Sequence, residues 1–147
     1  MMKKFFANLL ICFILLGITC TSYAANWQWI TSTDIITLSF DTTSIRPSES
    51  GRYFVWIKQE YTEAEGKNLS NKFQYDKPIA YFLIREEIDY KNEAIGTQST
   101  IAYANDGSVM GSYTNKFYDF TPVIPGTVGE IQFLVTLKEY QKQYSKI

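Results

Sequence analysis

The strongest strand signal in this chain is the stretch YFVWIKQEY, residues 53–61. Its first half is aromatic and β-branched, and these residue types are favoured in strands. Its second half turns polar, as expected of a central strand that leaves the core towards solvent. Residues 53–61 are therefore predicted to form the centre of a β-sheet, around which the rest of the chain is arranged.

Two strands are expected before this centre. Residues 35–41 alternate between apolar and small polar side chains, which indicates a strand with one buried face. The side chains predicted to be buried on it are Ile36, Leu38 and Phe40. Residues 27–30 are expected to form its partner strand, with a turn near residues 33–34. Residues 44–51 collect Pro, Ser and Gly, which favour turns, so this stretch is predicted to be a loop.

After the centre, a polar connection leads to a second long strand. Residues 62–77 are polar and charged, which predicts a long exposed connection with room for one helical turn. Function could lie there, because long loops are uncommon in compact domains without a reason. Residues 79–90 alternate again. The two faces of this predicted strand carry Phe82, Ile84, Ile88 and Tyr90 on one side and Tyr81, Leu83, Arg85 and Glu87 on the other.

A hairpin is predicted around Asp106-Gly107. Strand-like runs, residues 100–104 and 108–113, lie on either side of this dipeptide. Asp-Gly between two such runs is typical of a type I′ turn, in which both central residues have positive φ.

The last segment contains a helix signal and a competing strand signal. Thr127 and Glu130 have the spacing of a capping box, which predicts a helix beginning at Val128. Residues 131–138 also alternate between apolar and other side chains, which would suit a strand. The capping box and the helix-favouring residues 138–143 favour the helix.

Residues 1–24 have the features of a secretory signal peptide. A basic start at residues 1–4 precedes an apolar run at residues 9–18, and small residues end the segment, so we expect cleavage after Ala24. An uncleaved membrane anchor is one alternative, although it would need about 20 apolar residues and this run is shorter. Lipidation of Cys20 is the other alternative, although bulky residues precede it.

Removing the signal peptide limits the chemistry of the remaining chain. Removing 24 residues from 147 leaves 123, enough for one domain over residues 25–147, and both cysteines leave with the signal in a chain that has no histidine. The usual catalytic base, the commonest metal ligand and the thiol nucleophile are thus missing. We therefore expect no enzyme activity, no cofactor, no metal and no disulfide, and we expect aromatic packing to stabilise the core.

The mature chain is also mildly acidic. Lys3 and Lys4 leave with the signal, so 12 basic residues face 15 acidic ones and the net charge is −3. No basic field is present to attract nucleic acid, so no nucleic-acid partner is expected. No membrane span is expected after signal removal.

The densest carboxylates are Glu86, Glu87 and Asp89. Neighbouring strand residues point to opposite faces, so Glu87 and Asp89 could share a face while Glu86 could not join them. A glycosidase-like hydrolase that uses carboxylates alone would need such a pair. The favoured interpretation is a solvated strand edge that discourages edge pairing.

Aromatic residues near predicted loops and strand ends are candidates for a binding surface, because Tyr and Trp are enriched in interfaces. The candidate partner-binding residues are Tyr75, Tyr81, Arg85 and Tyr118. Phe117 and Phe120 lie in the same kind of position. Tyr140 and Tyr144 are four residues apart and are expected to dock one helix face onto the sheet.

The order of short motifs resembles the surface-adhesin protein E-like family of small exported bacterial proteins. The matching motifs are Trp29-Ile30, Asp41-Thr42-Thr43-Ser44-Ile45, Val55-Trp56, Glu87-Ile88-Asp89-Tyr90, Tyr103 with Asp106-Gly107, and Ile124-Pro125-Gly126-Thr127. The resemblance covers nearly the whole mature chain. It implies an α+β fold, an antiparallel sheet of about six strands with one C-terminal helix packed on a face, which agrees with the layers expected from the hydrophobic periodicity.

The chain departs from that family at two positions together. Members commonly have cysteines where this chain has Tyr90 and a residue near Leu137. The resemblance thus implies that a strand-to-helix disulfide is replaced here by an apolar contact. We predict that Tyr90 packs against the helix around Val135 and Leu137.

These observations favour an exported, non-catalytic protein of the periplasm, cell surface or medium. It would bind a protein partner as a surface adhesin that contacts host or envelope proteins, and its surface is a sheet face or the 62–77 connection. The alternatives are a periplasmic inhibitor or assembly partner and, less favoured, a carboxylate-only hydrolase. A homodimer is a further option, and fold alone does not decide among these functions.

Overall fold

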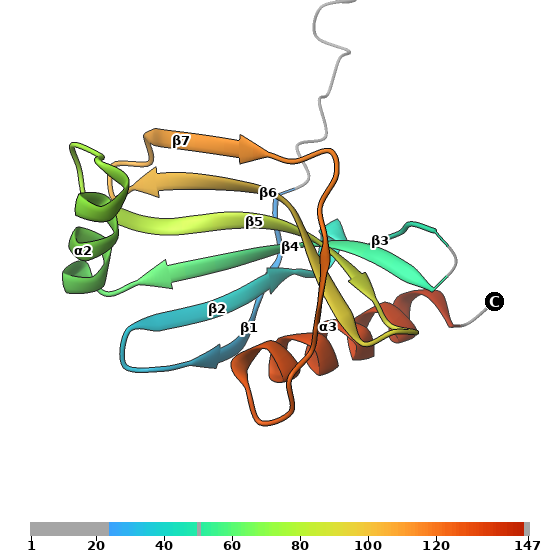
Figure 1. The fold of residues 1–147 in the computed structure, drawn as a ribbon. Helices are drawn as coiled ribbons and strands as arrows, with labels where there is room; N and C mark the ends of the chain where they lie inside the picture. Colours follow the sequence, from blue (N-terminus) through green and yellow to red (C-terminus); the bar gives the residue numbers. More distant parts are fainter. Residues whose placement is uncertain (1–23, 50, 146–147) are drawn as a thin grey trace, which may run out of the picture.

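A computed structural model of the protein describes residues 24–49 and 51–145 (Figure 1). The predicted signal peptide, including Cys20, lies outside the described residues except for Ala24. The elements are β1 (Trp27–Ser32), β2 (Ile36–Asp41), the 3-10 turn η1 (Thr42–Ser44), β3 (Arg46–Pro47), β4 (Arg52–Tyr61), α2 (Glu63–Phe73), β5 (Ile79–Asp89), β6 (Ala94–Ala104), β7 (Val109–Thr114), β8 (Phe120–Pro122) and α3 (Val128–Tyr144).

The strands form one antiparallel sheet in the order β1-β2-β4-β5-β6-β7, with β3 added to β4 and β8 added to β6. Figure 1 shows α3 along one side of this sheet and α2 at the far end of the strands. The predicted α+β class, with an antiparallel sheet and a packed C-terminal helix, is confirmed. The stretch 53–61 belongs to β4, in the interior of the sheet between β2 and β5.

The core lies between α3 and the sheet face that it covers. Alternate residues of β4 are buried there, as expected for a strand with one face on the core. The main buried side chains of this core are Leu38, Phe40, Tyr53, Val55, Ile57, Ile88 and Phe133. Ile36, the third residue predicted to be buried on β2, is half-buried against the same cluster.

The competing signals at residues 128–138 are resolved in favour of the helix. Thr127 caps α3 by accepting a hydrogen bond from the Glu130 amide at 3.4 Å. The Glu130 carboxylate reaches back one residue further than the capping-box pattern predicts and accepts from the Gly126 amide at 2.8 Å. The strand-like alternation fails because Ile131 and Leu134 stay exposed while Phe133 enters the core.

Tyr90 packs against α3, although at a different point from the one predicted. Its ring lies 5.6 Å from that of Tyr140 and 6.4 Å from that of Tyr53. Tyr140 in turn stacks on Tyr53 at 4.5 Å, and Tyr144 follows Tyr140 on the same helix face. The ring contact of Tyr90 is thus to Tyr140, and the predicted residues Val135 and Leu137 pack against the same core cluster.

The connection 62–77 is not a long loop. It holds α2, a helix of 11 residues that begins after the cap Thr62 and ends at Gln74 in the left-handed conformation. The helix lacks an apolar stripe because its buried residues are Gly66 and Ser70. Periodicity therefore gave no signal for it.

Two turns also differ from the prediction. The stretch 44–51 contains the short strand β3 in addition to loop. The hairpin between β6 and β7 is confirmed, but among its loop residues only Gly107 has positive φ. The Gly107 amide donates to the Ala104 carbonyl at 3.0 Å, which is the pattern of a three-residue loop with a bulge rather than type I′.

Within the part of the chain that the structure describes, the helices are too short or too polar to cross a membrane.

Candidate functional site

The two faces of the sheet differ in what covers them. Both helices pack on one face, α3 through Phe133 and α2 through Phe73, whose ring lies 6.3 Å from that of Phe82. We call the opposite side the open face. Its side chains come from the residues of each strand that alternate with the core residues. They include Trp27, Trp29, Arg46, Arg52, Phe54, Trp56, Lys58, Glu60, Tyr81, Leu83, Arg85, Tyr103 and Phe120, together with Glu87 and Asp89, which are buried.

The strand register places these side chains together. Directly opposite residues of an antiparallel pair share a face. Trp56 lies opposite Arg85, and Lys58 lies opposite Leu83 on one side and Ser39 on the other. Trp29 also lies opposite Ser39, which brings the first strand into the same surface.

The open face collects all three tryptophans and all three arginines of the chain. Trp27 and Trp29 come from β1 and Trp56 from β4. The arginines are Arg46, Arg52 and Arg85, from β3, β4 and β5. Trp and Arg are the residue types most enriched among interface hot spots. Their segregation to the face without a helix is the main functional feature of the fold.

Lys58 lies at the centre of an aromatic group on this face. Its ammonium nitrogen is 4.8 Å from the centre of the Tyr81 ring and 6.0 Å from that of Trp27. Tyr81 stacks on Tyr103 at 4.8 Å. Glu60 pairs with the same ammonium at 2.8 Å, so the aliphatic part of Lys58 is held across the rings.

Arg85 is held by a ring and keeps its hydrogen-bond donors available. Its guanidinium lies 4.6 Å from the centre of the Phe54 ring. Among residues 24–49 and 51–145, no carboxylate lies within ion-pair distance of Arg85. A stacked guanidinium with free donors is suited to bind a carboxylate or carbonyl oxygen of a partner.

Arg52 has the opposite arrangement. It stacks over Phe120 at 4.5 Å, and its Nε donates to Asp89 at 3.0 Å while Glu49 lies 3.3 Å from its Nη1. Its donors are thus used inside the protein. Of these two stacked arginines, Arg85 is the one that has no ion pair among the described residues.

The carboxylates Glu87 and Asp89 do not form a solvated strand edge. β5 lies inside the sheet, and both side chains are buried, so that prediction is wrong. Glu87 accepts hydrogen bonds from Ser48 at 2.5 Å and Tyr118 at 2.7 Å. Burial and the bond to Glu87 raise the pKa of Tyr118 to about 12. Glu87 therefore anchors the segment before β8.

Asp89 organises the turn that follows β5. Burial opposes its ionisation, but hydrogen bonds from Asn92 and Arg52 outweigh burial and lower the pKa of Asp89 below its usual value. Asn92 donates to Asp89 from its backbone nitrogen, at 3.0 Å, and from its side-chain Nδ2, at 2.9 Å. A general acid needs the opposite shift. Asp89 thus acts as a structural group, and nothing in this geometry favours a hydrolase.

Glu86 points to the covered face, where Gln132 of α3 donates to its carboxyl group. It is buried, and burial raises the pKa of Glu86 to about 8, with the Gln132 bond partly opposing the rise. A polar pair thus links the middle of β5 to the helix. No partner could reach this group without displacing α3.

Three of the four candidate residues lie on or beside the open face. Tyr81 and Arg85 belong to it, and the ring of Tyr118 rests over Gly96, so close that a Cβ there would lie 2.7 Å from Tyr118. Tyr75 lies on the covered side, where its hydroxyl approaches Gly111.

Sequence reasoning missed the tryptophans and Lys58 as surface residues. The sequence contained part of the evidence for this surface, because Trp27 and Trp29 are two residues apart on a predicted strand and therefore share a face. Which face they share depends on pairing with β2, and Lys58 joins them only through β4.

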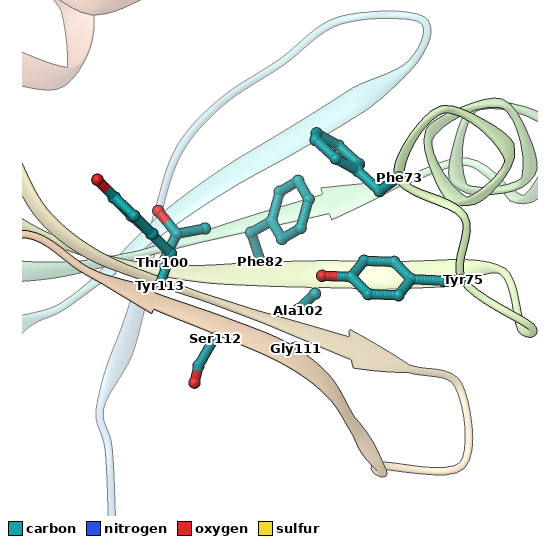
Figure 2. Close-up of a pocket in the computed structure, with 8 residues that line it drawn as sticks. All are labelled: Phe73, Tyr75, Phe82, Thr100, Ala102, Gly111, Ser112 and Tyr113. Carbon is teal, nitrogen blue, oxygen red and sulfur yellow. The ribbon is translucent and has the colours of Figure 1, made fainter.

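A cavity of about 280 Å³ opens on the covered side at the far end from α3 (Figure 2). It is lined by Phe73, Tyr75, Phe82, Thr100, Ala102, Gly111, Ser112 and Tyr113. Figure 2 shows Tyr75 and Tyr113 at opposite ends of the lining, with Ser112 pointing to the other side of the sheet. None of the lining residues is charged.

The described residues contain no group of three or more acidic, cysteine or histidine side chains able to hold a metal ion.

Comparison with known proteins shows a similarity to a solved structure. No protein-family model matches the chain, and no curated protein matches it. Its fold is similar to the crystal structure of protein E from non-typeable Haemophilus influenzae, with 9% sequence identity, a TM-score of 0.47, and coverage of 83% of this chain and 82% of that chain. A similarity of this size does not establish a family. The resemblance carried by the short motifs therefore stays a prediction.

Proposed function

We propose that this chain is an exported, non-catalytic binding protein that contacts a protein partner through its open face. Export rests on the signal-peptide features of residues 1–24. The observation that carries the binding role is the placement of every tryptophan and every arginine of the chain on the one face that neither helix covers.

The side chains of the open face indicate what kind of partner it would bind. Rings of Trp27, Trp29 and Tyr81 offer flat apolar contact, and Trp29 is 63% exposed. Arg85 adds donors for an oxygen acceptor. Lys58 and Glu60 neutralise one another, so the surface is not a basic strip that would attract polyanions. A folded protein surface with apolar groups and a carboxylate or carbonyl acceptor fits best.

A surface adhesin for host proteins is the first version of this proposal, and a periplasmic inhibitor or assembly partner is the second. Both versions use the same face, and they differ in where the partner is found. The candidate residues Tyr81, Arg85 and Tyr118 belong to both. Tyr75 belongs to neither, because it lies on the covered side.

Solid-phase binding to a panel of purified extracellular-matrix proteins tests the adhesin version. We expect saturable binding to at least one protein, weakened about tenfold by Arg85→Ala, since hot-spot truncations remove more than about 1 kcal/mol. Lys67→Ala, at an exposed position of α2, is the matched control and should leave binding unchanged.

Two results would count against this version. Absence of saturable binding to every matrix protein removes the adhesin role, and affinity capture from envelope extract with the same variants then tests the second version. Equal loss of binding in Arg85→Ala and Lys67→Ala would remove the open face as the site.

A further inference from the structure

The strand β7 is an exposed edge of the sheet. It pairs with β6 on one side and ends the strand order on the other. Alternate amide and carbonyl groups of an edge strand point outward without partners from the sheet. Six residues of about 3.3 Å each give an edge of about 20 Å.

This edge carries little of the protection that edge strands usually have, apart from an irregularity at Met110 in its pairing with β6. Its sequence, VMGSYT, has no charged residue and no proline. Natural sheets commonly use charges or proline there to prevent pairing with other chains. The opposite edge, β1, differs because α3 packs beside it and its Ile30 is buried. The two edges are therefore not equivalent, and β7 is the one built to accept another strand.

The uncharged cavity lies directly beside β7. Gly111 lies opposite Ala102, and Tyr113 lies opposite Thr100, and all four residues line the cavity. The next residue across the sheet is Phe82, opposite Ala102, so the row towards the edge is Phe82, Ala102 and then Gly111. Because Ala102 and Gly111 are small, they leave an empty space near the edge, and larger side chains enclose this space.

The walls of the cavity come from outside this row. Phe73 and Tyr75 close one end, and their rings lie 6.2 Å apart. Tyr113 closes the other end (Figure 2). Gly111 is required by this arrangement, since a Cβ there would lie 2.2 Å from the Tyr75 hydroxyl.

We propose that β7 binds an extended, uncharged peptide segment of a partner protein as an added strand, with one large apolar side chain of that segment seated in the cavity of Phe73, Tyr75, Phe82 and Tyr113. Backbone hydrogen bonds to the edge would supply affinity, and the cavity would select the side chain. This site lies apart from the open face.

The size and charge of the site define the segment. An apolar cavity of roughly 150 Å³ is already large enough for benzene, so about 280 Å³ accommodates a leucine or phenylalanine side chain. The lining and the edge carry no charge, so a charged segment would lose hydration without gaining an ion pair. An uncharged segment is therefore the complement.

A second copy of this chain fits the site less well. In a β7 to β7 pair, the side chains on the cavity side would be those of Gly111 and Tyr113 themselves. Glycine has none to offer, and Tyr113 already forms a wall. A segment of a partner protein can supply the large apolar side chain that a second copy of this chain cannot.

The experiment selects short displayed peptides against the purified protein and measures the affinity of the enriched peptide by fluorescence anisotropy. We expect enrichment of one large apolar residue flanked by uncharged strand-forming residues. Tyr113→Lys and Phe73→Lys, at walls that are 66% and 49% exposed, should fold and should each weaken binding about tenfold or more. Leu134→Lys on α3 should bind as the unchanged protein does, and Trp29→Lys reports whether the peptide has bound the open face instead.

Hydrogen exchange of the same samples locates the peptide. The outward-facing amides of β7, which β6 does not pair, should become protected only when the peptide is present. The proposal is overturned by no enrichment, by binding that both wall variants retain, or by binding that Trp29→Lys abolishes. It is also overturned if the protein alone sediments as a dimer whose outward-facing β7 amides are already protected, because the occupant would then be a second copy.

Discussion

The carboxyl group of Glu86 is buried in an environment that strongly disfavours its charged form. It lies on the covered face, opposite Val55 of β4, and its hydrogen bond comes from Gln132 of α3. Burial disfavours the charged form, so the folded protein holds the group protonated at neutral pH, with a pKa of about 8. The unfolded chain would ionise it near its ordinary value of 4.5.

This difference predicts the pH dependence of stability. Below about pH 4.5 both states are protonated, and the contribution of Glu86 to stability is fully present. As the pH rises towards 8, only the unfolded state releases the proton, so stability falls by up to about 1.4 kcal/mol per pH unit. Glu86→Gln should therefore match the unchanged protein at pH 4.5 and exceed its free energy of unfolding at pH 8, measured by urea denaturation.

A control variant distinguishes the effect of the burial of Glu86 from the effect of removing a negative charge. Glu63→Gln changes an exposed glutamate of α2 and should keep the original slope of stability against pH. If Glu86→Gln keeps that slope as well, Glu86 is not held protonated in the folded protein.

At the scale of elements, α2 shows how a helix can pack without an apolar stripe. A Cβ on Gly66 would lie 2.0 Å from the carbonyl oxygen of Ile79, so the helix approaches the start of β5 through backbone. Ser70 accepts a hydrogen bond from the Ile79 amide at 2.8 Å. The contact is small and polar, yet it fixes the end of α2 from which Phe73 and Tyr75 reach the cavity.

Gly66→Ala tests this close approach. Alanine has a higher helix propensity than glycine by about 1 kcal/mol, so an isolated helix would gain stability. In the folded protein we expect a net loss of about 1–3 kcal/mol, the usual range for overpacking, because the Ile79 carbonyl cannot move without disturbing β5. Thermal denaturation measures it, and Lys67→Ala at the exposed neighbour is the control. A stabilised Gly66→Ala protein would contradict the packing described.

Elements with strong local signals were predictable from the sequence. The β2 strand follows from period-two alternation, β4 follows from its aromatic and β-branched residues, and α3 follows from the Thr127 cap. α2 was not predictable in this way, because Gly66 and Ser70 carry no hydrophobic period. The environment of Glu87 was missed for another reason. Its burial depends on Tyr118 and Ser48, which lie 31 and 39 residues away in sequence.

At the scale of the whole molecule, the sheet separates two kinds of surface. One face carries the helices and the core, where Tyr53, Tyr90 and Tyr140 form an aromatic contact between strand and helix. The other face carries the tryptophans and arginines. Sequence reasoning found two members of that face, Tyr81 and Arg85, and could not assemble it, because the assembly depends on the register of β1, β2, β4 and β5.

The central claim is that the open face binds a protein partner, and site-specific photo-crosslinking in the cells that produce the protein tests it most directly. A crosslinking amino acid is placed at Trp29, 63% exposed on the open face, or at Leu134, 55% exposed on α3. We predict a discrete adduct of higher mass from position 29 alone, reduced by Arg85→Ala in the same chain. An adduct from position 134 with none from position 29 would contradict the account.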